Sequence, residues 1–149
     1  MTETAPRAAA WRGVFTATAL PFTDDLAVDL DAYAEHVAWL ADNGTHGVAP
    51  NGSLGEYQTL SDAERAKVVE TAVQASPEGF GVMAGCGAYG TLQSVRWIEQ
   101  AAEAGASSAI SYARRTSPVN SLTATISPSA CSCASTDGSR STLVSYGLL

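Results

Sequence analysis

The chain has 149 residues and a formal net charge of −7, and 46% of its residues are hydrophobic. This length fits one domain with a hydrophobic core, and the acidic balance argues against nucleic acid or an anionic membrane as the main partner. No apolar run approaches the roughly 20 residues of a membrane-spanning helix. The opening "MTETAPRAAA" has neither the basic start nor the apolar stretch of a signal peptide, so we expect a cytoplasmic protein.

The first regular elements are a strand and a helix that follow a flexible N-terminus of residues 1–11. A strand is expected over "GVFTATALPF" (13–22). The segment "DLDAYAEHVAWLADNG" (29–44) predicts a helix, because its apolar residues recur at spacings of three and four. Asp29 is the expected N-cap of this helix and Gly44 the expected stop.

Two more strand–helix pairs follow, over 46–50 with 62–75 and over 80–87 with 92–105. Strand starts recur about every 33 residues, which is the size of a βα unit in a parallel sheet. The sequence therefore predicts an α/β fold with three βα units over residues 12–106. "SSAISYA" (107–113) is a candidate fourth strand.

The composition changes after residue 106. Of the 43 residues in 107–149, 17 are Ser or Thr, and Asp137 is the single carboxylate among them. Such a segment does not easily bury enough apolar surface to order itself. We expect residues 107–149 to be irregular, and two interpretations stay open: a disordered tail, or translation in a shifted reading frame.

The cysteines and histidines do not form a recognisable metal-binding pattern. Cys86 lies in an apolar strand and is expected to be a small core residue. Cys131 and Cys133 have the spacing of a ligand pair, but His36 and His46 lie far away in the sequence and nothing nearby completes four ligands. We expect no metal site.

The stretch "GCGAYG" matches the G-x-G-x-x-G pattern through Gly85, Gly87 and Gly90, between a strand and a helix. That context suits a dinucleotide pyrophosphate. A nicotinamide site also needs an acid about 20 residues later, and none is present, although Arg114 and Arg115 suit a 2′-phosphate. The alternative is that these glycines let a strand turn sharply into a helix. An NADP-binding half-Rossmann module therefore stays one alternative function, and a non-catalytic fragment that pairs through its sheet edge is another.

The loop "NGSLGE" follows the second predicted strand, at the end of a parallel sheet where active-site groups gather. Main-chain N–H groups near Ser53 and Leu54 are placed to bind a carboxylate, with the Ser53 hydroxyl as a proton carrier or an extra donor. Glu56 is expected to brace the loop by hydrogen bonds rather than to act as a catalytic acid. An ordinary βα turn is the alternative. Ser61 with Glu64 three residues later predicts the next helix start.

Three stretches of the chain resemble the dihydrodipicolinate synthase / N-acetylneuraminate lyase family. "GVFTATALPFTDDLAVDLDAY" resembles the family's opening strand and its Pro-Phe turn. "NGSLGEYQTLSDAER" resembles the G-[ST]-T-G-E signature and the helix entry after it, and "VMAGCGAYGTLQSVRWIEQAAEAGA" resembles the third strand and helix. The likeness runs in order from about residue 12 to residue 106. It implies the first three to four βα units of a (β/α)₈ TIM barrel, followed by an irregular non-family tail.

The resemblance implies a class I aldolase or lyase. In this family a lysine on the sixth strand forms a Schiff base with pyruvate or another 2-oxo acid, which then condenses with an aldehyde or is released by the reverse cleavage. The resemblance implies no cofactor and no metal, a small-molecule 2-oxo acid substrate, and a homo-oligomer for the intact family member. Ser53 takes the place of the hydroxyl residue in a tyrosine-centred proton relay that also holds the keto acid. Leu54 falls in the carboxylate pocket and offers only its N–H there.

Three departures from the family pattern affect specificity and activity. Leu54 lacks the side-chain hydroxyl usual at its position, and Leu20 replaces a Thr that usually precedes the Pro-Phe turn. Together these changes predict a variant specificity rather than that of the standard lysine-pathway synthase. Lys67 is the single lysine, and it lies on the second predicted helix, which faces solvent. Imine formation needs a neutral, desolvated amine, and arginine stays protonated. Tyr112 and Tyr146 lie in unmatched sequence and receive no role.

A full barrel takes roughly 250 residues. We therefore expect a truncated family member without the Schiff-base lysine, inactive on its own, whose open sheet edges favour aggregation or oligomerisation.

Overall fold

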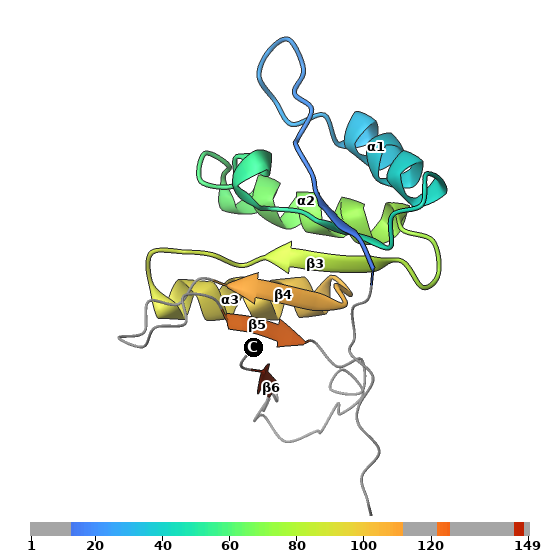
Figure 1. Ribbon diagram of the computed structural model, residues 1–149. Helices are drawn as coiled ribbons and strands as arrows, with labels where there is room; N and C mark the ends of the chain where they lie inside the picture. The colour runs from blue at the N-terminus through green and yellow to red at the C-terminus, as the bar shows by residue number, and fades with distance from the viewer. Residues whose placement is uncertain (1–12, 112–121, 126–144, 148–149) are drawn as a thin grey trace, which may run out of the picture.

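Strands and helices alternate along the chain in the computed structural model, which describes residues 13–111, 122–125 and 145–147 (Figure 1). The described residues contain no helix that is both long and apolar enough to cross a membrane. The elements are β1 (Phe15–Ala17), α1 (Leu30–Asp42), β2 (Gly47–Ala49), the 3₁₀ turn η1 (Ser53–Gly55), α2 (Asp62–Ala75), β3 (Gly81–Gly85), α3 (Thr91–Glu103), β4 (Ser108–Ser111), β5 (Leu122–Thr125) and β6 (Ser145–Gly147).

The described strands form one sheet whose spatial order follows the chain, from β1 to β6. The first four strands are parallel, with Phe15 opposite Gly47 and Met83 opposite Ser108. Helices connect β1 to β2, β2 to β3, and β3 to β4. This arrangement is the start of a TIM barrel, as the sequence predicts, and β4 is the expected fourth strand.

Strands β5 and β6 extend the sheet beyond β4 in antiparallel directions, with Ser108 opposite Thr125 and Ala124 opposite Tyr146. These strands were not predicted, because their four and three residues show no apolar period. Strand pairing is made by backbone groups, so short polar segments can supply the hydrogen bonds that the edge of β4 needs. Residues 112–121, 126–144 and 148–149 of the expected tail, and the expected flexible N-terminus, lie outside the described residues.

The helix ends follow the local sequence signals. The Asp29 side chain accepts a hydrogen bond from the Ala32 amide at 2.9 Å, which confirms the predicted N-cap of α1. Gly44 ends that helix with a φ of +86°, a value that favours glycine. At α2, the Ser61 hydroxyl accepts from the Glu64 amide at 3.3 Å and the Glu64 carboxylate accepts from the Ser61 amide at 2.8 Å. This reciprocal pair is a capping box, and it confirms the predicted start of α2.

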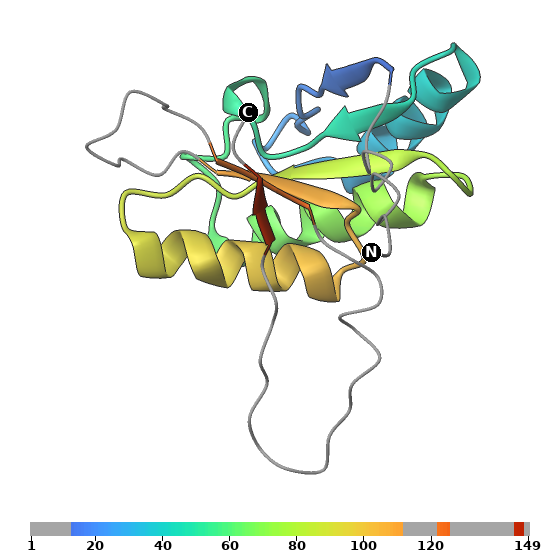
Figure 2. The ribbon, with the colours of Figure 1, turned by 60° about the horizontal axis from the view of Figure 1, so that its bottom comes forward.

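The hydrophobic core lies between the sheet and the helices. Helices α2 and α3 run side by side under β3 and β4 (Figure 2). Cys86 is buried in this core, which confirms its predicted place, and burial raises the pKa of its thiol to about 12. The core residues are Leu20, Tyr33, Val37, Leu40, Val48, Val68, Val69, Ala72, Val82, Ala84, Cys86, Trp97, Ile98, Ala101, Ala106 and Ala109.

The buried Tyr33 hydroxyl predicts a loss of stability in alkali. It lies 2.9 Å from the Thr18 hydroxyl, and burial raises the pKa of Tyr33 from 10.0 to about 12. Above pH 10 the unfolded tyrosine releases its proton and the folded one keeps it, so the free energy of unfolding falls with rising pH, by about 2 kcal/mol up to pH 12. Urea unfolding at pH 8 to 11 should show a shallower fall for Tyr33→Phe. Tyr89→Phe is the control for the loss of a fully exposed tyrosine hydroxyl. Equal slopes for the parent, Tyr33→Phe and Tyr89→Phe would contradict the prediction.

Candidate functional site

The predicted carboxylate-binding loop lies at the carboxyl end of β2, as expected. Ser53–Gly55 form the 3₁₀ turn η1. The Gly55 amide donates to the Gly52 carbonyl at 3.0 Å, and the Glu56 amide donates to the Ser53 carbonyl at 3.3 Å. The Ser53 and Leu54 amides have no acceptor among the described residues. The turn therefore presents two unused main-chain donors.

Both residues of the predicted site are exposed. Leu54 is 62% exposed, and Ser53 also faces solvent. Beneath them, Gly55 lies against the end of the first strand, where an added Cβ would be 3.3 Å from the Thr18 carbonyl oxygen and 3.8 Å from Leu20 Cγ. Leu20, a residue that departs from the family pattern, is thus a buried apolar contact directly under the loop. Binding of a carboxylate by Ser53 and Leu54 stays a prediction.

Glu56 braces the loop through its backbone. Its carbonyl oxygen accepts from both the amide and the hydroxyl of Thr59, each at 2.8 Å. Glu56 adopts a left-handed conformation with φ of +47°, and its side chain is exposed. The residue type predicts a brace made by the side chain, since carboxylates commonly bond to nearby amides. Among the described residues the carbonyl makes these bonds.

The end of β3 packs directly on the loop that follows β2. The Gly85 amide donates to the Pro50 carbonyl at 2.8 Å. A Cβ atom at Gly85 would overlap the Asn51 carbonyl oxygen and lie 2.6 Å from the Asn51 carbonyl carbon. The close approach of the Asn51 carbonyl therefore explains why residue 85 is glycine, and a bound dinucleotide is not needed to explain it. Gly90 caps α3 and has open space around it, while Arg114 and Arg115 lie outside the described residues.

A buried arginine joins these two strand ends, and the sequence analysis did not single it out. Arg65 on α2 is 6% exposed. Its Nη2 donates to the Gly85 and Gly87 carbonyls, both at 2.9 Å, and its own carbonyl accepts from Asn51 Nδ2 at 2.9 Å. The guanidinium lies over two aromatic rings, 4.8 Å from the centre of Tyr57 and 4.3 Å from the centre of Trp97.

The charge of Arg65 has no carboxylate partner within ion-pair distance among the described residues. Burial lowers the pKa of Arg65, but a guanidinium stays protonated in proteins. The sequence does contain a signal for this residue. Arg65 precedes Val68 and Val69 by three and four positions, so it lies on the apolar face of its helix, where a lone cation is unusual.

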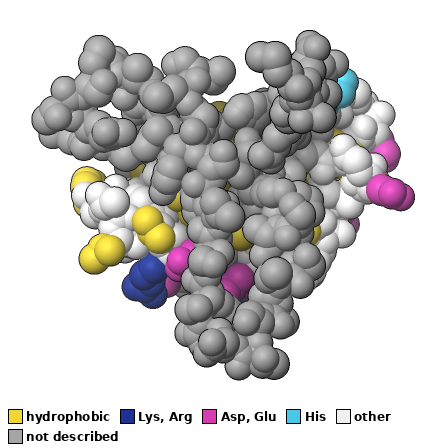
Figure 3. All heavy atoms as spheres, turned by 90° about the horizontal axis from the view of Figure 1, so that it is seen from below, with side chains coloured by type: hydrophobic (Ala, Val, Ile, Leu, Met, Phe, Trp, Pro, Cys, Tyr) yellow, Lys and Arg dark blue, Asp and Glu magenta, His cyan; other side chains and the backbone are white. Residues whose placement is uncertain are grey.

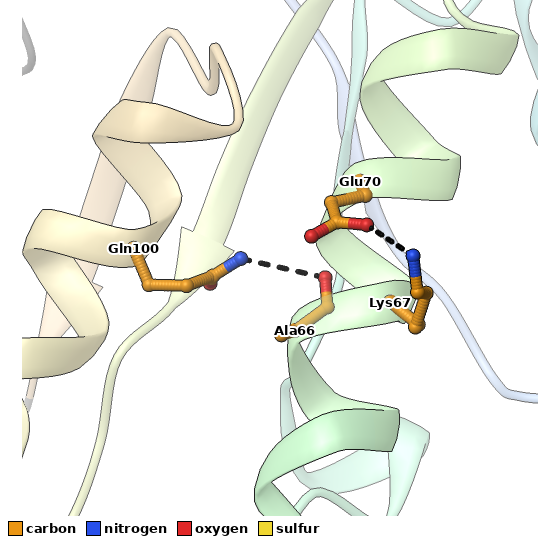
Figure 4. Close-up of polar contacts among 4 residues, drawn as sticks. All are labelled: Ala66, Lys67, Glu70 and Gln100. Atoms are coloured by element: carbon orange, nitrogen blue, oxygen red, sulfur yellow. Dashed lines mark hydrogen bonds and ion pairs between the residues drawn. The ribbon is translucent and has the colours of Figure 1, made fainter.

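Lys67 lies on the exposed side of the same helix. Its Nζ is 2.9 Å from the Glu70 carboxylate, and its side chain is 63% exposed (Figure 4). In the same view, Gln100 of α3 reaches across to the Ala66 carbonyl at 3.5 Å. The prediction that Lys67 belongs to a solvated outer helix is therefore confirmed.

Two surface hollows lie between α2 and α3, away from the strand ends. The larger, of about 350 Å³, is lined by Glu70, Gln74, Gln100, Glu103 and Ala104. We place the candidate site at the strand ends because parallel sheets collect reactive groups there.

The part of the chain that the structure describes holds no group of three potential metal ligands. Figure 3 shows acidic side chains next to basic ones on the face seen from below, so its described part carries both signs of charge.

Known proteins are similar to this chain in sequence and in fold. A sequence model of the dihydrodipicolinate synthetase family matches residues 10–113. The chain is 40% identical over 96 residues to the 4-hydroxy-tetrahydrodipicolinate synthase of Rhizobium meliloti (strain 1021), covering 64% of this chain and 33% of that protein. It is 41% identical over 100 residues to the enzyme of the same name from Methanothrix thermoacetophila, covering 67% and 33%.

Solved structures agree with the sequence matches. A crystal structure of dihydrodipicolinate synthase superposes with a TM-score of 0.66 at 31% identity, covering 73% of this chain and 38% of that one. The synthase of Aquifex aeolicus gives 0.65 at 32% identity, covering 71% and 37%. The chain thus spans about a third of the length of the curated relatives it matches. On the family match, the sequence identities and the shared fold, the chain belongs to the dihydrodipicolinate synthetase family.

Proposed function

We propose that this chain carries the 2-oxo acid carboxylate-binding segment of a Schiff-base aldolase or lyase, with pyruvate as the simplest substrate. The observation that carries the proposal is the place of the signature loop. It follows β2 at the carboxyl end of the sheet, and its Ser53 and Leu54 amides have no acceptor among the described residues. Two such amides suit a carboxylate, because charge-assisted hydrogen bonds to backbone N–H groups are strong.

The two residues contribute different groups. The Leu54 amide donates one hydrogen bond to the carboxylate, and its apolar side chain adds no further donor. The Ser53 hydroxyl is both donor and acceptor, so it can hold the keto acid and pass a proton toward the reacting oxygen. The apolar Leu20 under the loop supports a specificity different from that of the standard lysine-pathway enzyme.

Carbon–carbon chemistry of this class needs a neutral amine that attacks the ketone. In this chain the single amine side chain, Lys67, is exposed and paired with Glu70. Imine formation needs a desolvated amine, and the 63% exposed Lys67 side chain has no desolvating pocket around it. We therefore propose that the 149-residue chain binds a 2-oxo acid but does not form the imine on its own. A cytoplasmic location and a homo-oligomeric state rest on the sequence analysis and stay part of this proposal.

Titration with pyruvate tests the binding step. We expect the amide resonances of Ser53 and Leu54 to shift, with a dissociation constant in the millimolar range that a few hydrogen bonds support. Acetone, which has the ketone without the carboxylate, should leave both resonances in place. Ser53→Ala should weaken pyruvate binding about three- to tenfold, since it loses one hydrogen bond of about 1 kcal/mol. Unmoved resonances with pyruvate would refute the proposed site.

Borohydride reduction tests the absence of the covalent step. The intact mass of the chain should stay unchanged after incubation with pyruvate and borohydride. A reduced adduct on Lys67 would show that the exposed amine is active after all. Lys67→Met is the matched control, because it removes the amine and keeps a side chain of similar length.

A further inference from the structure

Arg65 is a buried cation, 6% exposed, without a counter-charge at ion-pair distance among the described residues. Transfer of a charge from water into a protein interior is costly, and well-packed apolar residues often replace buried charges without loss of stability. The buried Nε of Arg65 also has no hydrogen-bond partner among these residues. These costs indicate that the charge of Arg65 has a role beyond packing.

The contacts of Arg65 link the ends of two neighbouring strands. On the β3 side, Nη2 binds the Gly85 and Gly87 carbonyls on either side of Cys86. On the β2 side, the Arg65 carbonyl holds the Asn51 side chain, two residues before the loop donors begin. The two strand ends also touch directly, because the Gly85 amide donates to Pro50. Residue 65 thus contacts both neighbouring strand ends at the carboxyl edge of the sheet, β3 through its side chain and the β2 loop through its main chain.

We propose that Arg65 is a positioning residue for the 2-oxo acid site: it holds the end of β3 against the loop after β2, so that the Ser53 and Leu54 amides are ordered before the substrate binds. The inference rests on the proposed function. Donors held in place before binding raise affinity, because less conformational freedom is lost when the ligand arrives. The Arg65 side chain acts through the Gly85 and Gly87 carbonyls, and Gly85 in turn bonds to Pro50 before the loop. It does not touch the substrate, and the bond to Asn51 is made by the main-chain carbonyl of residue 65.

The surroundings of Arg65 require its planar shape. The guanidinium stacks near both the Tyr57 and the Trp97 ring, and one nitrogen serves two carbonyls. A lysine carries the same charge, but its ammonium is compact, strongly hydrated and unable to stack in this way. Lysine at this position should therefore keep the charge and lose the positioning.

The test compares Arg65→Lys and Arg65→Met with the parent chain. Arg96→Lys is the matched control, because Arg96 lies exposed on α3. Amide hydrogen exchange is measured at Gly85 and Gly55 near the site and at Tyr33 on α1, whose amide donates to Asp29. The dissociation constant for pyruvate is measured on the same samples at a temperature where each variant is folded. Arg65→Met keeps the apolar part of the side chain, so it provides the comparison if Arg65→Lys does not fold.

We expect exchange at Gly85 and Gly55 to rise about tenfold in both Arg65 variants, as the loss of a hydrogen bond to a charged group predicts. Exchange at the Tyr33 amide should stay near the parent value in the Arg65 variants, and exchange at all three amides should stay near it in Arg96→Lys. The dissociation constant for pyruvate should rise about fivefold or more in the Arg65 variants. A parallel rise at all three amides, or unchanged pyruvate affinity, would overturn the inference and leave Arg65 a structural residue. If the parent chain itself shows no pyruvate-induced shifts, the proposed function fails, and the exchange pattern alone then decides whether Arg65 orders the loop.

Discussion

Replacement of Gly85 by alanine is expected to lower the free energy of unfolding by about 3 kcal/mol, or to prevent folding. The added methyl group would overlap the Asn51 carbonyl oxygen and lie 3.1 Å from the Pro50 carbonyl oxygen. Both neighbours are backbone atoms, so relief requires the strand end or the loop to move, and overpacking of this kind costs 1–3 kcal/mol or more. Movement would also break the bond from the Gly85 amide to Pro50.

Urea unfolding followed by circular dichroism measures this effect. Gly52→Ala is the matched control, because the nearest atom to a Cβ there is the Ala49 carbonyl oxygen at 3.9 Å, an ordinary contact. Its φ of −87° suits alanine, so we expect a change of less than about 1 kcal/mol. If both variants unfold at the parent's urea concentration, β3 and the β2 loop are not in the contact described above.

Replacement of Trp97 by alanine is the second change with a large expected effect. Trp97 is 8% exposed and belongs to the core, and its ring covers the Arg65 guanidinium at 4.3 Å. Truncation of a buried tryptophan costs about 3–5 kcal/mol through lost apolar burial and the cavity left behind. Here it also removes one of the two aromatic faces that offset the burial of a charge.

Trp39→Ala is the control for the same residue type. Trp39 lies on α1, stacks on His36 with ring centres 6.4 Å apart and is 59% exposed. Its truncation should cost less than about 1 kcal/mol. Both variants are compared with the parent by urea unfolding followed by far-ultraviolet circular dichroism, which does not depend on the tryptophans removed. Equal losses for the two variants would show that Trp97 is not the core residue described.

The regular elements between residues 13 and 111 were predictable because their signals are local. Asp29 and the pair of Ser61 and Glu64 bond to backbone groups within three residues. Hydrophobic period and caps thus place each helix to within a residue or two. Strands β5 and β6 carry no such signal, since the partner that makes them strands is β4.

The candidate loop was predictable as well, because a glycine-bracketed turn after a parallel strand is both a local pattern and a family signature. The contacts that hold the loop in place were not predictable from the sequence. Asn51 is buried with a positive φ, and Arg65 lies under two aromatic rings from different segments. These contacts join residues up to 32 positions apart (Arg65 and Trp97). Patterns within a single helix or turn do not reveal contacts between residues so far apart in the sequence.

Local signals were enough to predict the order of the βα units, the ends of the helices, the place of the Ser53–Leu54 loop and the solvated position of the single lysine, because each follows from residues within one or two turns of one another. The need for glycine at position 85 and the contacts that hold the loop in place became visible in the assembled fold. Both depend on separate strand ends that meet across the sheet, where close packing and a buried, hydrogen-bonded cation arise only after the units have assembled.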